Sequence, residues 1–226
     1  MRSTFSPHAP YSVSEKLFEL LNDATANDLV TIHNQETLPE EDFIKSGTGD
    51  FLKLYEKMGI DISFYNPSGK SSLQTWWPRL NKNQSIILVH NVTTSSNDIA
   101  FTKLETGNAK PETFFCLCPN ANLYITNTLP DVNMLMENNC TIVLGTDSLA
   151  SNRQLDIIEE IKTLHQYFPA IPLDAMLQWA TINGARALQM DDRLGSFEKG
   201  KQPGIVLIEG IENAHVTNKT SSKRVL

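Results

Sequence analysis

The chain has 226 residues, of which 40% are hydrophobic and 20% are charged, a composition that permits a folded core and excludes a disordered chain. Its net charge of -7 argues against a basic surface for nucleic acid. No apolar run approaches the ~20 residues that span a bilayer, and the first residues lack the apolar stretch of a secretory signal. Three cysteines are too few for a disulfide scaffold, which favours an intracellular protein. Together these features predict a cytoplasmic protein without nucleic-acid or membrane partners.

Four short apolar runs predict β-strands that are buried on both faces. Each run is continuous rather than alternating and is rich in β-branched residues, which is typical of parallel sheets. The runs cover residues 29–33 (LVTIH), 85–90 (SIILVH), 113–118 (TFFCLC) and 140–147 (CTIVLGTD). A brief further strand is expected at residues 205–208.

Helical patterns lie between these runs. The segment Ser12-Val13-Ser14-Glu15 matches a capping box, and leucines follow it at helical spacing. Residues 60–80 are expected to form an extended loop with a short helix. The alternation of strands and helices predicts an α/β fold with a parallel sheet. Further helices are predicted at residues 50–58, 97–104, 131–137, 155–167 and 173–190.

Each predicted strand ends in a residue that can do chemistry. His90, Cys118 and Asp147 are 28 and 29 residues apart, which is close to one βα unit of a (β/α)8 barrel. His33 lies 57 residues before His90, and His8 lies 25 residues before His33. In a barrel these strand ends share one face, which holds the active site. Doubly wound sheets follow the same rule, so the spacing alone leaves both folds open.

Three of these strand-end residues are of types that bind metals. His33 begins a His-x-x-Glu pattern, in which Glu36 could pass a proton to or from a bound water. His90 ends the most apolar strand, and Asp147 follows a wholly apolar strand, where a carboxylate needs a partner. Each has an ordinary alternative as a loop cap or a hydrogen-bonded strand end. Together they favour a metal site.

Other side chains are candidates for substrate contact. His8 stands between two prolines that fix the backbone and would present its imidazole rigidly. Trp76 and Trp77, with Phe64, could stack on a planar ring, although packing of the loop is the alternative that we favour. Asn122 could bind a ligand or simply form a turn. Phosphate-binding glycine loops, a Gly-x-Ser-x-Gly elbow and His-Glu-x-x-His are all absent from the sequence.

Seven segments together resemble the amidohydrolase superfamily, in its cytosine deaminase, chlorohydrolase and S-adenosylhomocysteine deaminase-like branch. Their order and spacing match the C-terminal part of that family from residue 1 to the end. The combination is much more specific than any one segment. The segments are SPHAPYSVS (6–14), HNQET (33–37), LVHN (88–91), CPNANLYI (118–125), LGTDSLASN (144–152), ATINGARAL (180–188) and LGSFEKGKQPGIVLI (194–208).

The resemblance implies an α/β fold that is part of a (β/α)8 TIM barrel, about strands 4 to 8, over residues 1–190. Residues 191–226 would then be the C-terminal remnant of the small β-sandwich that flanks the barrel. The implied activity is hydrolysis of carbon–nitrogen bonds other than peptide bonds, in a small-molecule substrate, by a metal-activated water that attacks an sp2 carbon. The implied cofactor is one divalent metal, zinc first, with iron or manganese as alternatives.

Carried over position by position, the resemblance assigns His33, His90 and Asp147 as metal ligands, with His90 alternatively orienting the water. Glu36 would be the proton shuttle, and Asp147 would also accept a proton from the water. The implied catalytic set is therefore Glu36, His90 and Asp147. The predicted substrate contacts are His8, Asn122 and Asn152, which lie in the matched segments, and Trp76 from the loop.

The sequence departs from the family at one decisive point, because it contains no His-x-His pair, which members carry at the end of the first strand. The first three βα units are not represented either. We therefore expect an incomplete site on a fragment, with little or no hydrolase activity from the isolated chain. A missing N-terminal half, or a second copy of the chain in a homo-oligomer, would supply the absent strands. The alternative is a non-catalytic binding or scaffold protein on the same fold.

Overall fold

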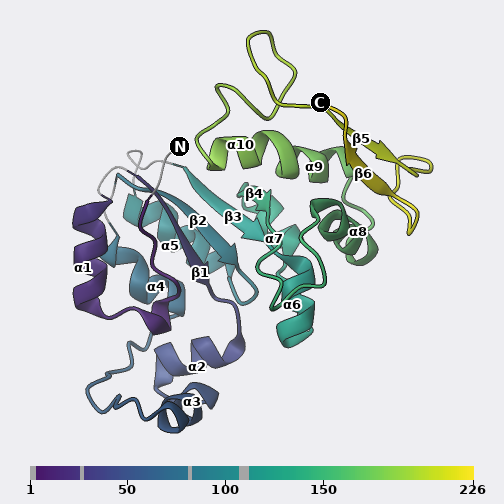
Figure 1. The fold of residues 1–226 in the computed structure, drawn as a ribbon. Helices are drawn as coiled ribbons and strands as arrows, with labels where there is room; N and C mark the ends of the chain where they lie inside the picture. Colours follow the sequence, from purple (N-terminus) through teal and green to yellow (C-terminus); the bar gives the residue numbers. More distant parts are fainter. Residues whose placement is uncertain (1–3, 26–27, 81–82, 107–111) are drawn as a thin grey trace.

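A computed structural model describes residues 4–25, 28–80, 83–106 and 112–226 (Figure 1). At its centre is a four-stranded sheet whose strands run parallel in the order β1-β2-β3-β4. The four apolar runs form this sheet, which confirms the predicted α/β fold. The strands are β1 (Leu29–Asn34), β2 (Ser85–His90), β3 (Thr113–Leu117) and β4 (Thr141–Leu144).

Helices connect the strands, as parallel pairing requires. Short 3₁₀ turns at Pro10–Ser12 and Trp77–Arg79 precede α1 and follow α4. None of the described helices is long and apolar enough to cross a membrane. The helices are α1 (Glu15–Ala24), α2 (Leu38–Ser46), α3 (Asp50–Met58), α4 (Ser72–Trp76), α5 (Ser96–Thr106), α6 (Pro119–Thr126), α7 (Val132–Glu137), α8 (Ile157–Tyr167), α9 (Leu173–Gln178) and α10 (Gly184–Ala187).

The two faces of the sheet are covered unequally. One face packs against helices through a large apolar cluster that includes Ile32, Leu88 and Phe115. The other face carries a smaller cluster in which Phe114 packs with Ala187 of α10. Alternate residues of a strand point to opposite faces, so β2, β3 and β4 each contribute to both clusters, whereas β1 contributes only to the large one.

The second face of the sheet is open over β1 and β2. Thr31 is exposed there, and Ile87 and Val89 are only half-buried. The prediction of strands buried on both faces therefore holds for β3 but is wrong for β1 and β2 within the described residues. A continuous apolar run shows what a strand is suited to pack against, and the described residues cover this face of β1 and β2 only in part.

The outer side of β1 is flanked by an irregular segment. The backbone N–H of His33 donates to the carbonyl of His8 at 2.9 Å. The backbone N–H of Thr31 donates to the hydroxyl of Ser6 at 3.2 Å. Residues 6–8 run beside β1 with too few backbone hydrogen bonds to form a strand, so the strand predicted to end at His8 is not formed over the described residues 4–8.

The helix predicted over residues 173–190 is interrupted by a π-helical turn, Trp179–Asn183, and ends at Ala187. The wider turn brings Asn183 to the outer edge of β4. There its side-chain amide donates to the backbone carbonyl of Ile142 at 2.9 Å. This hydrogen bond replaces the one that a neighbouring strand would give.

Three further helix starts differ from the prediction. Ser14 rather than Ser12 caps α1. Helix α2 was not predicted, although Thr37 and Glu40 form a Thr-x-x-Glu capping pattern and the hydroxyl of Thr37 accepts from the N–H of Glu40 at 3.3 Å. Helix α6 was also missed, although Pro119 stands at its first turn. Both missed helices are short and lack a clear apolar period, which hides them from pattern analysis.

Beyond α10 the chain is largely irregular. Strands β5 (Val206–Glu209) and β6 (Ser221–Arg224) pair antiparallel and form a separate two-stranded sheet (Figure 1). The predicted strand at residues 205–208 is thus confirmed as β5. Ile208 packs against the large apolar cluster, which joins this hairpin to the rest of the fold.

We expect Asn183→Ala to lower the free energy of unfolding by about 1–3 kcal/mol, because the carbonyl of the buried Ile142 loses its donor. Denaturant unfolding measures the change. Asn218→Ala, at an exposed position, is the control and should change the free energy by less than about 0.5 kcal/mol. Equal losses in the two variants would contradict the role of Asn183 at the β4 edge.

Candidate active site

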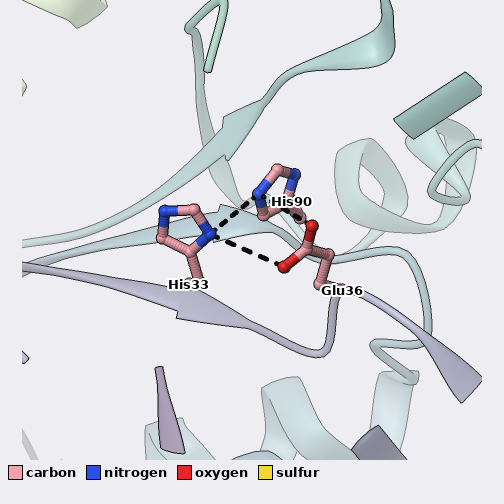
Figure 2. Close-up of side chains that lie close together, drawn as sticks. All are labelled: His33, Glu36 and His90. Atoms are coloured by element: carbon pink, nitrogen blue, oxygen red, sulfur yellow. Dashed lines mark hydrogen bonds and ion pairs between the residues drawn. The ribbon is translucent and has the colours of Figure 1, made fainter. Parts of the chain in front are cut away.

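The candidate site is built at the carboxyl ends of β1 and β2. These strands pair in parallel with His33 opposite Val89 and Asn34 opposite His90. By register alone His33 and His90 would face opposite sides of the sheet. His90 ends its strand with a φ of 80°, however, and its ring lies beside that of His33, while Glu36 turns back from the loop after β1 toward both rings (Figure 2).

The three side chains form a compact group whose ligand atoms all lie within 4.8 Å of one another. His33 Nδ1 lies 3.1 Å from His90 Nε2. One carboxylate oxygen of Glu36 lies 3.6 Å from His33 Nδ1, and the other lies 3.6 Å from His90 Nε2 (Figure 2). Over the residues that the structure describes, no other group of three His, Cys, Asp or Glu side chains has this metal-binding arrangement.

Burial and charge act differently on these three groups. Burial works against a charge on His33, but the carboxylates of Glu36 and Asp147 outweigh it and raise the pKa of His33. His90 is fully buried, and burial lowers its pKa. Burial also works against a charge on Glu36, but the two imidazoles outweigh it and lower its pKa. Glu36 is therefore ionised at neutral pH, and His33 accepts a proton more readily than His90.

The backbone is left-handed at several residues around the site. The φ angle is 48° at Gln35, 80° at His90, 61° at Asn91 and 55° at Asp147. For residues other than glycine such conformations are uncommon and cost roughly 1–3 kcal/mol each. They occur together at the ends of β1, β2 and β4, so contacts around these turns must hold them in place.

Asp147 follows β4 but lies outside the compact group. Its carboxylate accepts a hydrogen bond from the hydroxyl of Ser151. Its charge still acts on His33 and His90, since it favours the protonated form of both. The structure thus brings together two of the three predicted metal ligands and places Glu36, rather than Asp147, as the third member of the group.

His8 lies beside the compact group on its exposed side. Its ring centroid is 4.9 Å from that of His33, and its Nδ1 lies 3.1 Å from the hydroxyl oxygen of Ser12. The side chain is exposed. Contact between His8 and a substrate stays a prediction, and the ring stands where such contact can occur.

The profile of the amidohydrolase family matches residues 1–226. The chain belongs to the amidohydrolase family. It is 30% identical over 215 residues to a 5-methylthioadenosine/S-adenosylhomocysteine deaminase of Teredinibacter turnerae. That match covers 91% of this chain and 42% of the relative. The chain therefore spans less than half the length of this curated amidohydrolase relative.

Two solved deaminase structures have a similar fold. An adenosine deaminase from Xanthomonas campestris with bound zinc is 25% identical, with a TM-score of 0.64 over 92% of this chain and 43% of that chain. The aminofutalosine deaminase of Helicobacter pylori, in complex with methylthio-coformycin, has a TM-score of 0.73 at 23% identity. This second match covers 90% of this chain and 49% of the other. The comparisons confirm the predicted amidohydrolase resemblance.

Three predicted substrate contacts of this amidohydrolase are buried in the structure. Trp76 is 1% exposed and donates its indole N–H to a side chain of β1 at 3.2 Å, so it is a core residue rather than a stacking surface. Asn122 is buried with its Nδ2 3.0 Å from His90 Nδ1. Asn152 donates to the carbonyl that precedes Asp147 at 2.7 Å. The hydrogen bonds of all three therefore go to other parts of the chain, and their contact with a substrate stays a prediction.

Two carboxylates that no sequence pattern indicated, Glu40 and Glu160, are fully buried around the site. Glu40 accepts from two successive backbone N–H groups, those of Gln35 at 3.1 Å and Glu36 at 3.0 Å. Glu160 accepts from the first turn of α6 at 2.9 Å and from Asn152 at 2.7 Å. Burial raises the pKa of Glu40 to about 7 and also raises that of Glu160. Their helical positions gave no sign that they turn inward.

We expect Glu36→Gln to lower the pKa of His33, because the carboxylate of Glu36 favours the protonated ring. NMR titration of the imidazole resonances measures the pKa. Since folding raises this pKa, His33 stabilises the fold at low pH, and this contribution is lost as the pH rises through its folded pKa. Glu36→Gln should shrink that contribution. Glu15→Gln, in an exposed ion pair with Arg79, is the control and should leave the pKa of His33 unchanged. An unchanged His33 pKa in Glu36→Gln would contradict the coupling between the two residues.

Proposed function

We propose that this chain carries part of the active site of a metal-dependent hydrolase that removes an amino group from a small planar molecule. The observation that supports it is the compact group of His33, Glu36 and His90 at the ends of two adjacent parallel strands in an amidohydrolase. Catalytic residues of (β/α)8 barrels lie at this end of the strands. A binding or scaffold protein is the alternative, and the intact group of metal-ligand types favours the enzyme.

The donor set fits a divalent metal. Two imidazole nitrogens on one tetrahedral zinc lie about 3.4 Å apart, close to the 3.1 Å between His33 Nδ1 and His90 Nε2. Asn122 also supports a metal at this site. Its side-chain oxygen is buried without a hydrogen-bond partner among the described residues. If the side-chain amide is flipped, so that its oxygen and nitrogen exchange places, the oxygen accepts the Nδ1–H of His90. The Nε2 lone pair of His90 is then free for a metal.

His33 and His90 would hold the metal, with Glu36 or Asp147 as the carboxylate beside it. Zinc is the ion that we propose, with iron or manganese as alternatives, because imidazole and carboxylate ligands suit all three. When bound, the ion supplies Lewis acidity and lowers the pKa of a water to about 7.

Glu36 has the protonation state that a proton shuttle needs. Its lowered pKa makes it a carboxylate at neutral pH, so it can accept a proton from the attacking water. It then returns that proton to the nitrogen, which leaves as ammonia while a carbon–oxygen bond replaces the carbon–nitrogen bond. Asp147 is the second carboxylate and would accept the other proton of the water, which passes on to the ring nitrogen of the product and restores the carboxylate. His8 would contact the substrate at the exposed side of His33.

The relatives suggest the substrate class. Their names describe deaminases of 5-methylthioadenosine, S-adenosylhomocysteine and adenosine. We propose that the small-molecule substrate of this protein is likewise a purine-type amine. We also propose a cytoplasmic protein, which is supported by its three free cysteines.

The finer architecture is also part of this proposal. We propose that residues 1–190 are part of a (β/α)8 barrel and that residues 191–226 belong to a flanking β-sandwich. The half-exposed Ile87 and Val89 support the first part, since interior positions of a closed barrel are filled by such side chains. The antiparallel β5–β6 pair supports the second. An N-terminal half or a second copy of the chain would supply the strands that close the barrel.

Zinc binding tests the metal assignment. We expect about one zinc per chain, and a loss of affinity of about 10-fold or more in His33→Ala and in His90→Ala, because each variant removes an imidazole ligand. Competition with a chromophoric chelator measures the affinity. His215→Ala removes an imidazole outside the site and should bind zinc like the wild type. Undiminished zinc binding in both site variants would overturn the assignment.

Ammonia release from 5-methylthioadenosine tests the activity. We expect slow turnover at most from the zinc-loaded chain, because the His-x-His pair of the family is absent from its sequence. Glu36→Gln should abolish whatever turnover is present, whereas the exposed Glu15→Gln should leave it unchanged. Robust turnover by the wild-type chain would refute an incomplete site, and turnover that survives in Glu36→Gln would refute the shuttle.

A further inference from the structure

Glu40 is a fully buried carboxylate of α2 to which the proposed chemistry gives no part. Its Oε1 accepts from the backbone N–H of Gln35 at 3.1 Å and from the hydroxyl of Ser72 at 2.5 Å. Its Oε2 accepts from the backbone N–H of Glu36 at 3.0 Å. Three donors thus satisfy a carboxylate in a place where an unpaired polar group would be costly.

The two backbone N–H groups belong to the turn that presents Glu36 to the site. Gln35 in this turn has a φ of 48°, a conformation that side chains other than glycine rarely adopt. Such a residue persists only when its surroundings hold it. Because Glu40 bonds both N–H groups, it fixes the direction in which Glu36 leaves the turn toward His33 and His90.

We propose that Glu40 is a positioning residue for Glu36. It holds the turn after β1 in the conformation in which the carboxylate of Glu36 reaches both imidazoles. The part of this proposal that concerns catalysis rests on the function proposed for Glu36, whereas the hold on the backbone does not depend on it.

Helix α4 completes the hold on this turn. Ser72, in its first turn, donates to Glu40, and Trp76, in its last turn, donates its indole N–H to Asn34 of β1 at 3.2 Å. The turn that carries Glu36 therefore lies between a strand and two helices that are bonded to one another. Helix α4 lies in the predicted loop of residues 60–80, from which Trp76 was expected to contact substrate. In the structure this helix supports the turn that carries Glu36.

The neighbouring Glu41 provides a matched control on the same helix. Its carboxylate accepts from the backbone N–H of Ser72 at 3.1 Å and from the side-chain amide of Gln35 at 2.7 Å. It accepts from neither backbone N–H group that Glu40 holds. Neutralising Glu41 therefore removes comparable polar contacts and leaves the backbone of the turn untouched.

Amide hydrogen exchange, followed by NMR in the metal-free chain, tests the hold directly. The two N–H groups bond different oxygens of Glu40, and in Glu40→Gln one of these oxygens becomes an NH2 group, which donates and cannot accept. We expect the amide of Gln35, of Glu36 or of both to exchange at least 10-fold faster than in the wild type, and the amide of Ile32 in β1 to be unchanged. Glu41→Gln should leave the amides of Gln35 and Glu36 as protected as they are in the wild type.

Glu40→Asp keeps the charge but is one methylene shorter, and it serves as the test if Glu40→Gln does not fold. Unchanged exchange at both amides in a folded Glu40 variant would overturn the proposal, as would equal acceleration in Glu41→Gln. Where turnover is measurable, Glu40→Gln should lower kcat and leave KM unchanged. A raised KM with an unchanged kcat would also contradict the positioning role of Glu40. The exchange test needs neither metal nor substrate, so its outcome is separate from that of the proposed function.

Discussion

The in-register parallel pairing of β1 with β2 is the constraint on which the site depends. Because Asn34 stands opposite His90, the two strands end together and the turns that follow begin side by side. A slip of one residue would offset these two turns and move every side chain of one strand to the other face of the sheet. Buried amides join the two ends, since Asn34 Nδ2 donates to Asn91 Oδ1 at 3.1 Å and the indole of Trp76 donates to Asn34.

Buried carboxylates on helices hold the loops that carry the functional groups. Glu40 of α2 bonds the turn after β1. Glu160 of α8 bonds the start of α6 and also Asn152, which in turn bonds the carbonyl before Asp147. Hydrogen bonds to carboxylates are strong where water is excluded, so they can offset the cost of left-handed residues at the strand ends. Glu40 and Glu160 thus support the site through its loops, although neither belongs to the compact group.

The apolar runs predicted the four parallel strands, and the strand-end rule predicted that His33 and His90 would meet. The sequence could not predict that Glu36 rather than Asp147 joins them, because this depends on left-handed turns that no local pattern marks. It also could not assign Trp76, since an indole suits a substrate ring and an internal hydrogen bond equally well. Only the packing of α4 against β1 decides between the two. Buried polar groups are therefore the part of this site that lies beyond pattern analysis.

During synthesis, the outer edge of β4 is made well before the residue that covers it. Strand β4 ends at Leu144, and the π-helical turn that contains Asn183 begins at Trp179, 35 residues later. Until Asn183 reaches the carbonyl of Ile142, the nascent sheet presents an unpaired edge of the kind through which separate chains join. In that interval the edge of β4 is open to such pairing at Ile142, and the docking of the helical run after α8 closes this position.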